Sequence, residues 1–209
     1  MAFDYKKEFK DIYKPGKKPS LIEIPKLSYI AVRGKGNPNV ENSEYEQSIQ
    51  LLYPIIFTIK MSKMTDVKLD NYFDFVVPPL EGLWWTSDYT DFDYSNKDYF
   101  NFISMIRLPD FVSPEIFNWA VDEAKIKKEM DFNRVEYFSY DEGLCVQAMH
   151  VGSYDDEPET ISKLSKFIED DYCFDLSNQR FHHEIYLSDP RRCKVENLKT
   201  VVRIPIRKV

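Results

Sequence analysis

Residues 181–190 (FHHEIYLSDP) constrain the fold of this chain most strongly, because their polar and apolar side chains alternate. Alternate residues of a β-strand point to opposite faces of a sheet. One face then carries His183, Ile185 and Leu187, and the other carries His182, Glu184, Tyr186 and Ser188. A glutamate between apolar neighbours in a strand loses hydration, and it is tolerated when it is paired, protonated or used in function. We predict that the Ile185 face packs on a helix and that Glu184 lies in a small-molecule pocket.

The first half of the chain predicts a strand, a helix and two further strands. The strand lies within residues 22–34, and the apolar spacing of residues 43–61 is that of an amphipathic helix. Two strands are expected at residues 71–77 and 80–87, separated by a pair of prolines. These elements form a first repeat over residues 22–87.

The last third of the chain predicts the same order of elements. A strand at residues 144–151 is followed by a helix at residues 157–171 and by strands at residues 181–188 and 200–207. These elements form a second repeat within residues 134–207. Two strand–helix–strand–strand units can pack side by side with pseudo-twofold symmetry. The predicted fold is therefore α+β, an antiparallel sheet backed by helices, with a concave ligand groove on its uncovered face where the repeats join.

The remaining segments are expected to be a helical insertion and a flexible lead-in. Residues 98–130 predict two helices, at residues 98–107 and 114–130, and the second begins with a serine N-cap followed by proline. Residues 1–19 are charged and rich in proline and glycine near their end, which favours a flexible N-terminal lead-in. Residues 20–209 are then a single domain.

Charge and composition exclude several classes of partner. The net charge is −7, and the 28 lysines and arginines are scattered rather than gathered in a basic stripe, which disfavours nucleic-acid binding. No apolar run approaches the roughly 20 residues that span a bilayer, and no apolar leader begins the chain. The three cysteines form no CxxC pair. We expect a cytoplasmic protein with no membrane contact.

Motifs for nucleophiles, metals and cofactors are missing or misplaced. The glycines of residues 34–36 lack the third glycine of a dinucleotide loop, and no serine lies in a nucleophile elbow. Asp88, Asp91, Asp93 and Asp98 do not have the spacing of a calcium loop. His182 and His183 point to opposite faces of a strand, so they cannot chelate one ion together. We therefore expect neither a metal site nor a cofactor.

Carboxylates among aromatic residues are the remaining candidates for function. Aromatic residues make up 15% of the chain, and Glu81 precedes the pair Trp84–Trp85, one of which should face the groove because consecutive strand residues alternate. The alternative is that both tryptophans fill the core, that Glu184 forms a surface salt bridge and that the tyrosines pack without a ligand. The candidate ligand-binding residues are Glu184, Tyr186, Trp85, Trp84, Glu81, Tyr154 and His182.

Five stretches carry a resemblance to a known family. They are residues 78–85 (PPLEGLWW), 105–110 (MIRLPD), 142–147 (EGLCVQ), 149–158 (MHVGSYDDEP) and 182–190 (HHEIYLSDP). In these stretches the chain resembles the GyrI-like small-molecule-binding family, which also forms the effector domain of multidrug-sensing regulators. The resemblance implies tandem strand–helix–strand–strand repeats, an aromatic groove between them, and a pocket glutamate at Glu184.

Two functions follow from these residues and this resemblance. The first is binding of a planar, hydrophobic and cationic small molecule, which stacks on Trp85, Tyr186 and other aromatic rings around Glu184. The alternative, which only the resemblance implies, is a hydrolase of cyclopropane-bearing alkylating compounds, in which Glu184 activates water and Tyr154 or Tyr186 assists. A weaker third interpretation, a porphyrin site, needs His150 or His182 as axial ligand. The chain offers no helix-turn-helix, so a role in transcription is not expected.

Overall fold

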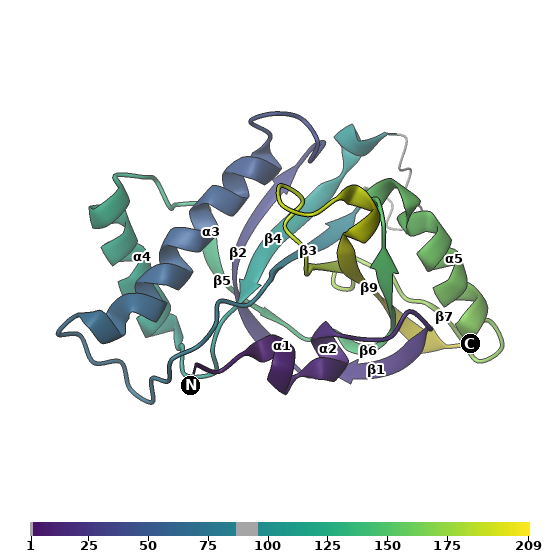
Figure 1. Ribbon diagram of the computed structural model, residues 1–209, viewed down its shortest axis with the longest axis horizontal. Coiled ribbons are helices and arrows are strands. Elements are labelled where there is room, and N and C mark those ends of the chain that lie inside the picture. Colours follow the sequence, from purple (N-terminus) through teal and green to yellow (C-terminus); the bar gives the residue numbers. More distant parts are fainter. Residues whose placement is uncertain (1, 87–95) are drawn as a thin grey trace.

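A nine-stranded antiparallel sheet forms the centre of the structure, a computed structural model that describes residues 2–86 and 96–209. Its path runs β1-β6-β9-β8-β3-β4-β2-β5, and β7 pairs with β9 off this path. The strands are β1 (Ser20–Ile24), β2 (Leu27–Lys35), β3 (Leu80–Trp85), β4 (Asn101–Arg107), β5 (Val135–Tyr140), β6 (Gly143–Val151), β7 (Tyr172–Phe174), β8 (His182–Tyr186) and β9 (Lys199–Lys208). The predicted α+β class, with an antiparallel sheet backed by helices, is confirmed (Figure 1).

The strand order has the same form when it is read from either end of the sheet. β2, α3 (Glu44–Met61), β3 and β4 form one strand–helix–strand–strand unit, and β6, α5 (Glu157–Ile168), β8 and β9 form the other. The two units meet where β3 pairs with β8, and each unit continues outward through its last strand to its first. Strands β1 and β5 then extend the two ends of this arrangement. This order supports the predicted tandem repeat.

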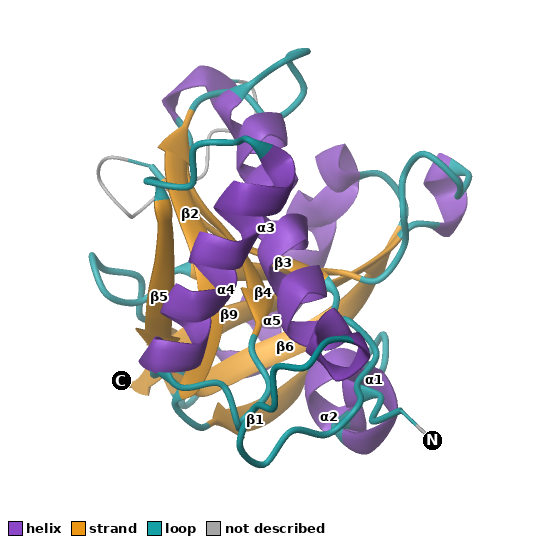
Figure 2. Cartoon of the chain, turned by 90° about the vertical axis from the view of Figure 1, so that its left-hand side faces the viewer, coloured by secondary structure: helices purple, strands orange, loops and turns teal. Residues whose placement is uncertain are grey.

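Helices α3 and α5 cover one face of the sheet, each over its own repeat. Ser48 of α3 donates a hydrogen bond to Ser104 of β4, and Leu164 of α5 packs against Ala148 and Val202. Ser104 pairs with Gly82, and Val202 pairs with Glu184. Paired residues point to the same face of a sheet, so both helices cover the face that carries Gly82 and Glu184. Helix α4 (Pro114–Lys128) packs against α3 (Figures 1 and 2). No helix in the described part of the chain is both long and apolar enough to cross a bilayer.

Local signals explain where the helices begin and which face they bury. Ser43 caps α3 by accepting a hydrogen bond from the backbone N–H of Glu46, and Ser113 caps α4 in the same way. The side chains of Leu52, Ile55 and Ile56 on α3 are buried, because their spacing follows one face of the helix.

Two segments differ from their predicted secondary structure. Residues 101–107, expected within a helix, form β4, and every side chain from Phe102 to Arg107 is buried. A strand buried on both faces has a continuous apolar pattern, which periodicity does not separate from a short helix. Residues 71–77, expected as a strand, make only an isolated bridge from Phe75 to Phe3. Their apolar residues reflect packing of Phe75 in the core rather than a strand ladder.

The N-terminal residues form two short helices in place of the expected flexible lead-in. These are α1 (Tyr5–Glu8) and α2 (Lys10–Tyr13), and the side chains of Tyr5 and Tyr13 are buried. The side chains of Gln147 and Arg203 donate hydrogen bonds to backbone carbonyls of α2, at 2.7 and 2.8 Å. These buried donors lie more than 130 residues away in the sequence, so the sequence near the N-terminus does not reveal them.

Candidate ligand-binding site

A cavity of about 870 Å³ lies between α3, the first turn of α5 and the sheet. Strands β3 and β8 form its floor, because α3 and α5 each cover their own repeat and leave the join between the repeats open. The groove was expected on the face of the sheet without helices, so its predicted position is wrong. The residues that line it most directly are Trp84, Tyr186, Glu184, Tyr45, Tyr154 and Glu157.

The floor of the cavity is organised around Gly82. Glu184 lies opposite Gly82 in the β3–β8 register, and Trp84 Nε1 donates a hydrogen bond of 2.8 Å to the hydroxyl of Tyr186. A Cβ atom at position 82 would lie 2.7 Å from Trp84 Nε1 and 2.9 Å from the Tyr186 hydroxyl. Only glycine leaves room for these two side chains to meet across the strand.

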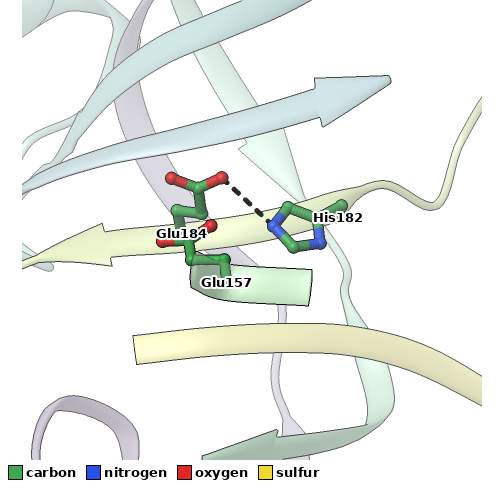
Figure 3. Close-up of side chains that lie close together, drawn as sticks. All are labelled: Glu157, His182 and Glu184. Atoms are coloured by element: carbon green, nitrogen blue, oxygen red, sulfur yellow. Dashed lines mark hydrogen bonds and ion pairs between the residues drawn. The ribbon is translucent and has the colours of Figure 1, made fainter. Parts of the chain in front are cut away.

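Two carboxyl groups and an imidazole lie together at one end of this floor (Figure 3). His182 and Glu184 share a face of β8, and His182 Nε2 donates a hydrogen bond of 3.1 Å to Glu184 Oε1. Glu157, the first residue of α5, brings its carboxyl group next to that of Glu184. One potential donor atom from each of the three residues lies within 4.8 Å of the others.

The two carboxyl groups do not ionise independently. Burial raises the pKa of Glu157 well above its ordinary value, and the adjacent charge of Glu184 raises it further. Lys97 opposes this shift, but its ammonium group is also paired with Asp155. Both effects favour the protonated form of the Glu157 carboxyl group.

The tyrosines around the cavity stay protonated and can donate hydrogen bonds. Burial, followed by the negative charge of Glu184, raises the pKa of Tyr154 to about 12. Burial also raises the pKa of Tyr186 and of Tyr45 well above that of a free phenol. The ring of Tyr45 lies 5.2 Å from that of Trp84, and the rings of Tyr154 and Tyr186 meet edge to face at 5.8 Å.

His150 fixes the turn that presents Tyr154 and Glu157. Its Nε2 donates a hydrogen bond of 2.8 Å to the carbonyl oxygen of Ser153, and its Nδ1 shares one of 2.9 Å with the Thr160 hydroxyl. A carbonyl oxygen only accepts, so Nε2 carries a proton. Both ring nitrogens are used, which leaves His150 no free nitrogen for a porphyrin iron.

The structure brings four of the predicted residues to the cavity and separates the others. Glu184, Tyr186, Trp84 and Tyr154 line it, and His182 contacts Glu184 from the end of the floor. The ring of Trp85 packs 4.7 Å from that of Phe181, and Glu81 is buried beside His183, both on the opposite face of the sheet. One tryptophan faces the cavity, as expected, but it is Trp84 rather than Trp85. The side chains of β3 alternate, so Trp84 lies on the same face of the strand as Gly82.

Sequence reasoning missed Glu157 and Tyr45. An acidic residue in the first turn of a helix is common, so Glu157 carried no signal of its own. Tyr45 lies within the apolar spacing that predicts α3, and this pattern indicates packing rather than ligand binding. The spacing of Tyr154 and Glu157 around a predicted helix start could have indicated that both approach the strand of Glu184.

The sequence model of the GyrI-like small molecule binding domain matches residues 17–207. The chain belongs to this family. A structure of an uncharacterized conserved protein from Listeria innocua is 44% identical, with a TM-score of 0.91, covering 98% of this chain and 100% of that one. A hydrolase from Listeria innocua is 42% identical, with a TM-score of 0.88 and the same coverage. No match was found among curated proteins.

More distant GyrI-like structures share the fold alone. The C-terminal domain of EcmrR is 16% identical, with a TM-score of 0.54, covering 92% of this chain and 98% of that domain. Membership of the GyrI-like family shows that this protein binds a small molecule.

This GyrI-like domain also has a buried ionic cluster on the face opposite the cavity. His183 donates hydrogen bonds to Glu142 and Glu81, each at 3.0 Å, and Arg203 donates to Glu142 at 3.1 Å. Burial alone would lower the pKa of His183, but the charge of Glu142 raises it to about 9. Burial alone would raise the pKa of Glu142, but His183 and Arg203 lower it to about 2. Tyr13 joins this cluster to α2 by donating to Glu81 at 3.3 Å.

Proposed function

We propose that the cavity binds a planar, hydrophobic cation whose positive charge lies next to Glu184. The observation that carries this proposal is a carboxylate at the floor of a cavity walled by aromatic rings. The side chain of Glu184 is only 12% exposed, and no lysine or arginine among the described residues forms an ion pair with it. A buried carboxylate without a cationic partner attracts a ligand that brings one.

The aromatic walls suit a flat ligand. Trp84, Tyr45 and Tyr154 come from a strand, a helix and a turn, so their rings surround the space above Glu184 from different sides. Each ring that stacks on a cation contributes about 0.5–2 kcal/mol. The protonated hydroxyl groups of the tyrosines can also donate hydrogen bonds to polar atoms of the ligand.

Titration with rhodamine 6G, a planar hydrophobic cation, tests this function. We expect binding at one site per chain, followed by calorimetry and by quenching of tryptophan fluorescence, since Trp84 lines the cavity. Glu184→Gln keeps the shape of the side chain and removes its charge, and we expect it to weaken binding by about tenfold or more.

Glu159→Gln is the matched control, because Glu159 is an exposed residue of the same helix that carries Glu157. It should bind rhodamine 6G like the unmodified chain. Absence of binding to the unmodified chain, or equal affinity in Glu184→Gln, would contradict the proposal.

Hydrolysis of cyclopropane-bearing alkylators is the second candidate function. It is favoured by the 42% identity to a hydrolase from Listeria innocua and by the tyrosines next to Glu184. In this reaction Glu184 takes a proton from water while the water oxygen bonds to a cyclopropane carbon. The ring carbon–carbon bond breaks, and its electron pair moves to a conjugated carbonyl oxygen, which then takes up a proton. Tyr154 would donate a hydrogen bond to that oxygen.

The ultraviolet spectrum of a cyclopropane alkylator incubated with the protein separates the two functions. Hydrolysis predicts many turnovers per chain, which Glu184→Gln abolishes and Tyr154→Phe slows. Quenching of tryptophan fluorescence at one ligand per chain, with no change in the ligand spectrum over time, would exclude hydrolysis and leave binding as the function.

Two further features agree with a cytoplasmic small-molecule binder. All three cysteines are free thiols, as expected in a reducing compartment. The basic residues remain scattered in the sequence, which argues against a nucleic-acid partner.

A further inference from the structure

We propose that Glu157, His182 and Glu184 bind a divalent metal ion of the Zn²⁺ class at the floor of the cavity. His182 and Glu184 are two residues apart on β8, so both side chains leave the strand on the same face. The third donor comes from the first turn of α5, on the other side of the same space (Figure 3). No metal site was expected from sequence because the neighbours His182 and His183 point to opposite faces of the strand. The two residues whose side chains lie together are His182 and Glu184.

The distances between the donor atoms fit a shared ion after small side-chain movements. His182 Nε2 and Glu184 Oε1 are 3.1 Å apart, and all three donor atoms lie within 4.8 Å of one another. Nitrogen and oxygen ligands lie about 2.0–2.2 Å from Zn²⁺, so ligands of one ion are separated by about 3–4 Å. Coordination requires the lone pair of Nε2, so the imidazole proton moves to Nδ1.

An unpartnered oxygen supports a cation in this position. Glu157 is 1% exposed, and its Oε1 accepts no hydrogen bond from any described residue. A divalent ion would bind both carboxylates and offset both charges at once.

The set of donors selects the kind of ion and leaves part of its coordination shell open. One imidazole and two carboxylates, without a thiolate, suit Zn²⁺, Co²⁺ or Mn²⁺ rather than Cu⁺. Glu157 and Glu184 also line the cavity, so a fourth position would face it. Three protein donors with one open position are typical of metal sites that bind water or substrate.

The ion and a cationic ligand would compete for the same carboxylates. The ligand titrations described above are therefore done in the presence of a chelator, and the metal titrations without organic ligand. Rhodamine 6G binding without metal binding would overturn this inference and leave the proposed function intact. Metal binding without rhodamine 6G binding would overturn the proposed function and leave the metal site intact.

Calorimetric titration of the chelator-treated full chain with ZnCl₂, and visible absorption after addition of CoCl₂, test the site directly. We expect one ion per chain and Co²⁺ bands of nitrogen and oxygen coordination. Glu157→Gln should weaken Zn²⁺ binding by about tenfold or more, and Glu159→Gln should leave it unchanged.

Thermal melts check that each variant folds, and Glu184→Gln serves as a second variant if Glu157→Gln is unstable. No Zn²⁺ binding, or unchanged affinity in the folded variants of both residues, would overturn the inference.

Discussion

Gly82 decides how closely the side chains of the cavity floor approach one another. The hydrogen bond between Trp84 and Tyr186 passes directly over its Cα, within the space that a Cβ would occupy. Gly82→Ala must therefore displace at least one of these rings. We expect a loss of about 1–3 kcal/mol in the free energy of unfolding and weaker ligand binding, measured by chemical denaturation and by the rhodamine 6G titration.

Gly16→Ala is the control for this change. A Cβ at position 16 would have an ordinary contact of 3.8 Å with the backbone nitrogen of Lys18. Stability and binding should both stay close to those of the unmodified chain. Equal behaviour of the two alanine variants would show that the Trp84–Tyr186 contact does not depend on Gly82.

Single residues were predictable from sequence where their local pattern was unusual. Glu184 stood out because a carboxylate interrupts an otherwise half-apolar strand, and the structure places it on the cavity floor. The expectation that Trp85 faces the cavity is wrong, because alternation gives two faces and does not say which one meets the helices. Glu157 looked like any acidic residue at a helix start, and only the fold brings it to Glu184.

At the scale of elements, the N-terminal helices are attached to the sheet by polar contacts. The Tyr13 hydroxyl donates to Glu81, and this hydroxyl is buried within the ionic cluster. Tyr13→Phe removes the donor and leaves a buried carboxylate with one fewer partner. We expect a loss of about 1.5–3 kcal/mol in the free energy of unfolding, measured by urea denaturation.

Tyr99→Phe provides the comparison, because the side chain of Tyr99 is 70% exposed. Its stability should change by no more than about 0.5 kcal/mol. If Tyr13→Phe were equally mild, the contact with Glu81 would not hold α2 on the sheet.

Elements with strong end signals were predicted well, and fully buried ones were not. Ser113 and Pro114 gave the start of α4, and the apolar spacing gave α3. The strand β4 was taken for a helix because both of its faces are buried, which removes the alternation that identifies a strand. Helices α1 and α2 are too short for a periodic pattern, and the partners of α2 lie far away in the sequence, at Glu81, Gln147 and Arg203.

At the scale of the whole molecule, the buried ionic cluster makes stability depend on pH. The pKa of His183 is raised from 6.5 to about 9, so its contribution is complete below about pH 6.5 and is lost as pH rises through about 9. The pKa of Glu142 is lowered from 4.5 to about 2, so its contribution is present above about pH 4.5 and is lost as pH falls through about 2.

Thermal melts across the pH range test this dependence. We expect the highest melting temperature between about pH 4.5 and 6.5, with a decline toward pH 9 as His183 loses its proton. A decline of about 1 kcal/mol lowers the melting temperature of a chain of this size by roughly 2–4 °C. A melting temperature that does not fall between about pH 6.5 and pH 9 would contradict the assignment of a charged His183.

The tandem arrangement was predictable from the order of elements even where individual elements were misassigned. The strand expected at residues 80–87 is confirmed as β3, whereas the strand expected at residues 71–77 is wrong and β4 takes its place in the unit. The unit remains strand–helix–strand–strand, because the chain must return twice across the sheet after each helix. Which face holds the cavity depends on the packing of α3 and α5, and element order carries no information on that.

The opposite orientations of His183 and Glu184 also bear on how the chain avoids misfolding. If β8 paired with its neighbours one residue out of step, each side chain would turn to the other side of the sheet. Glu184 would then meet Glu81 and Glu142, and carboxylates would repel one another where an imidazolium now joins them. The polar residues of β8 thus disfavour a shifted strand register during folding, in addition to any part they take in ligand binding.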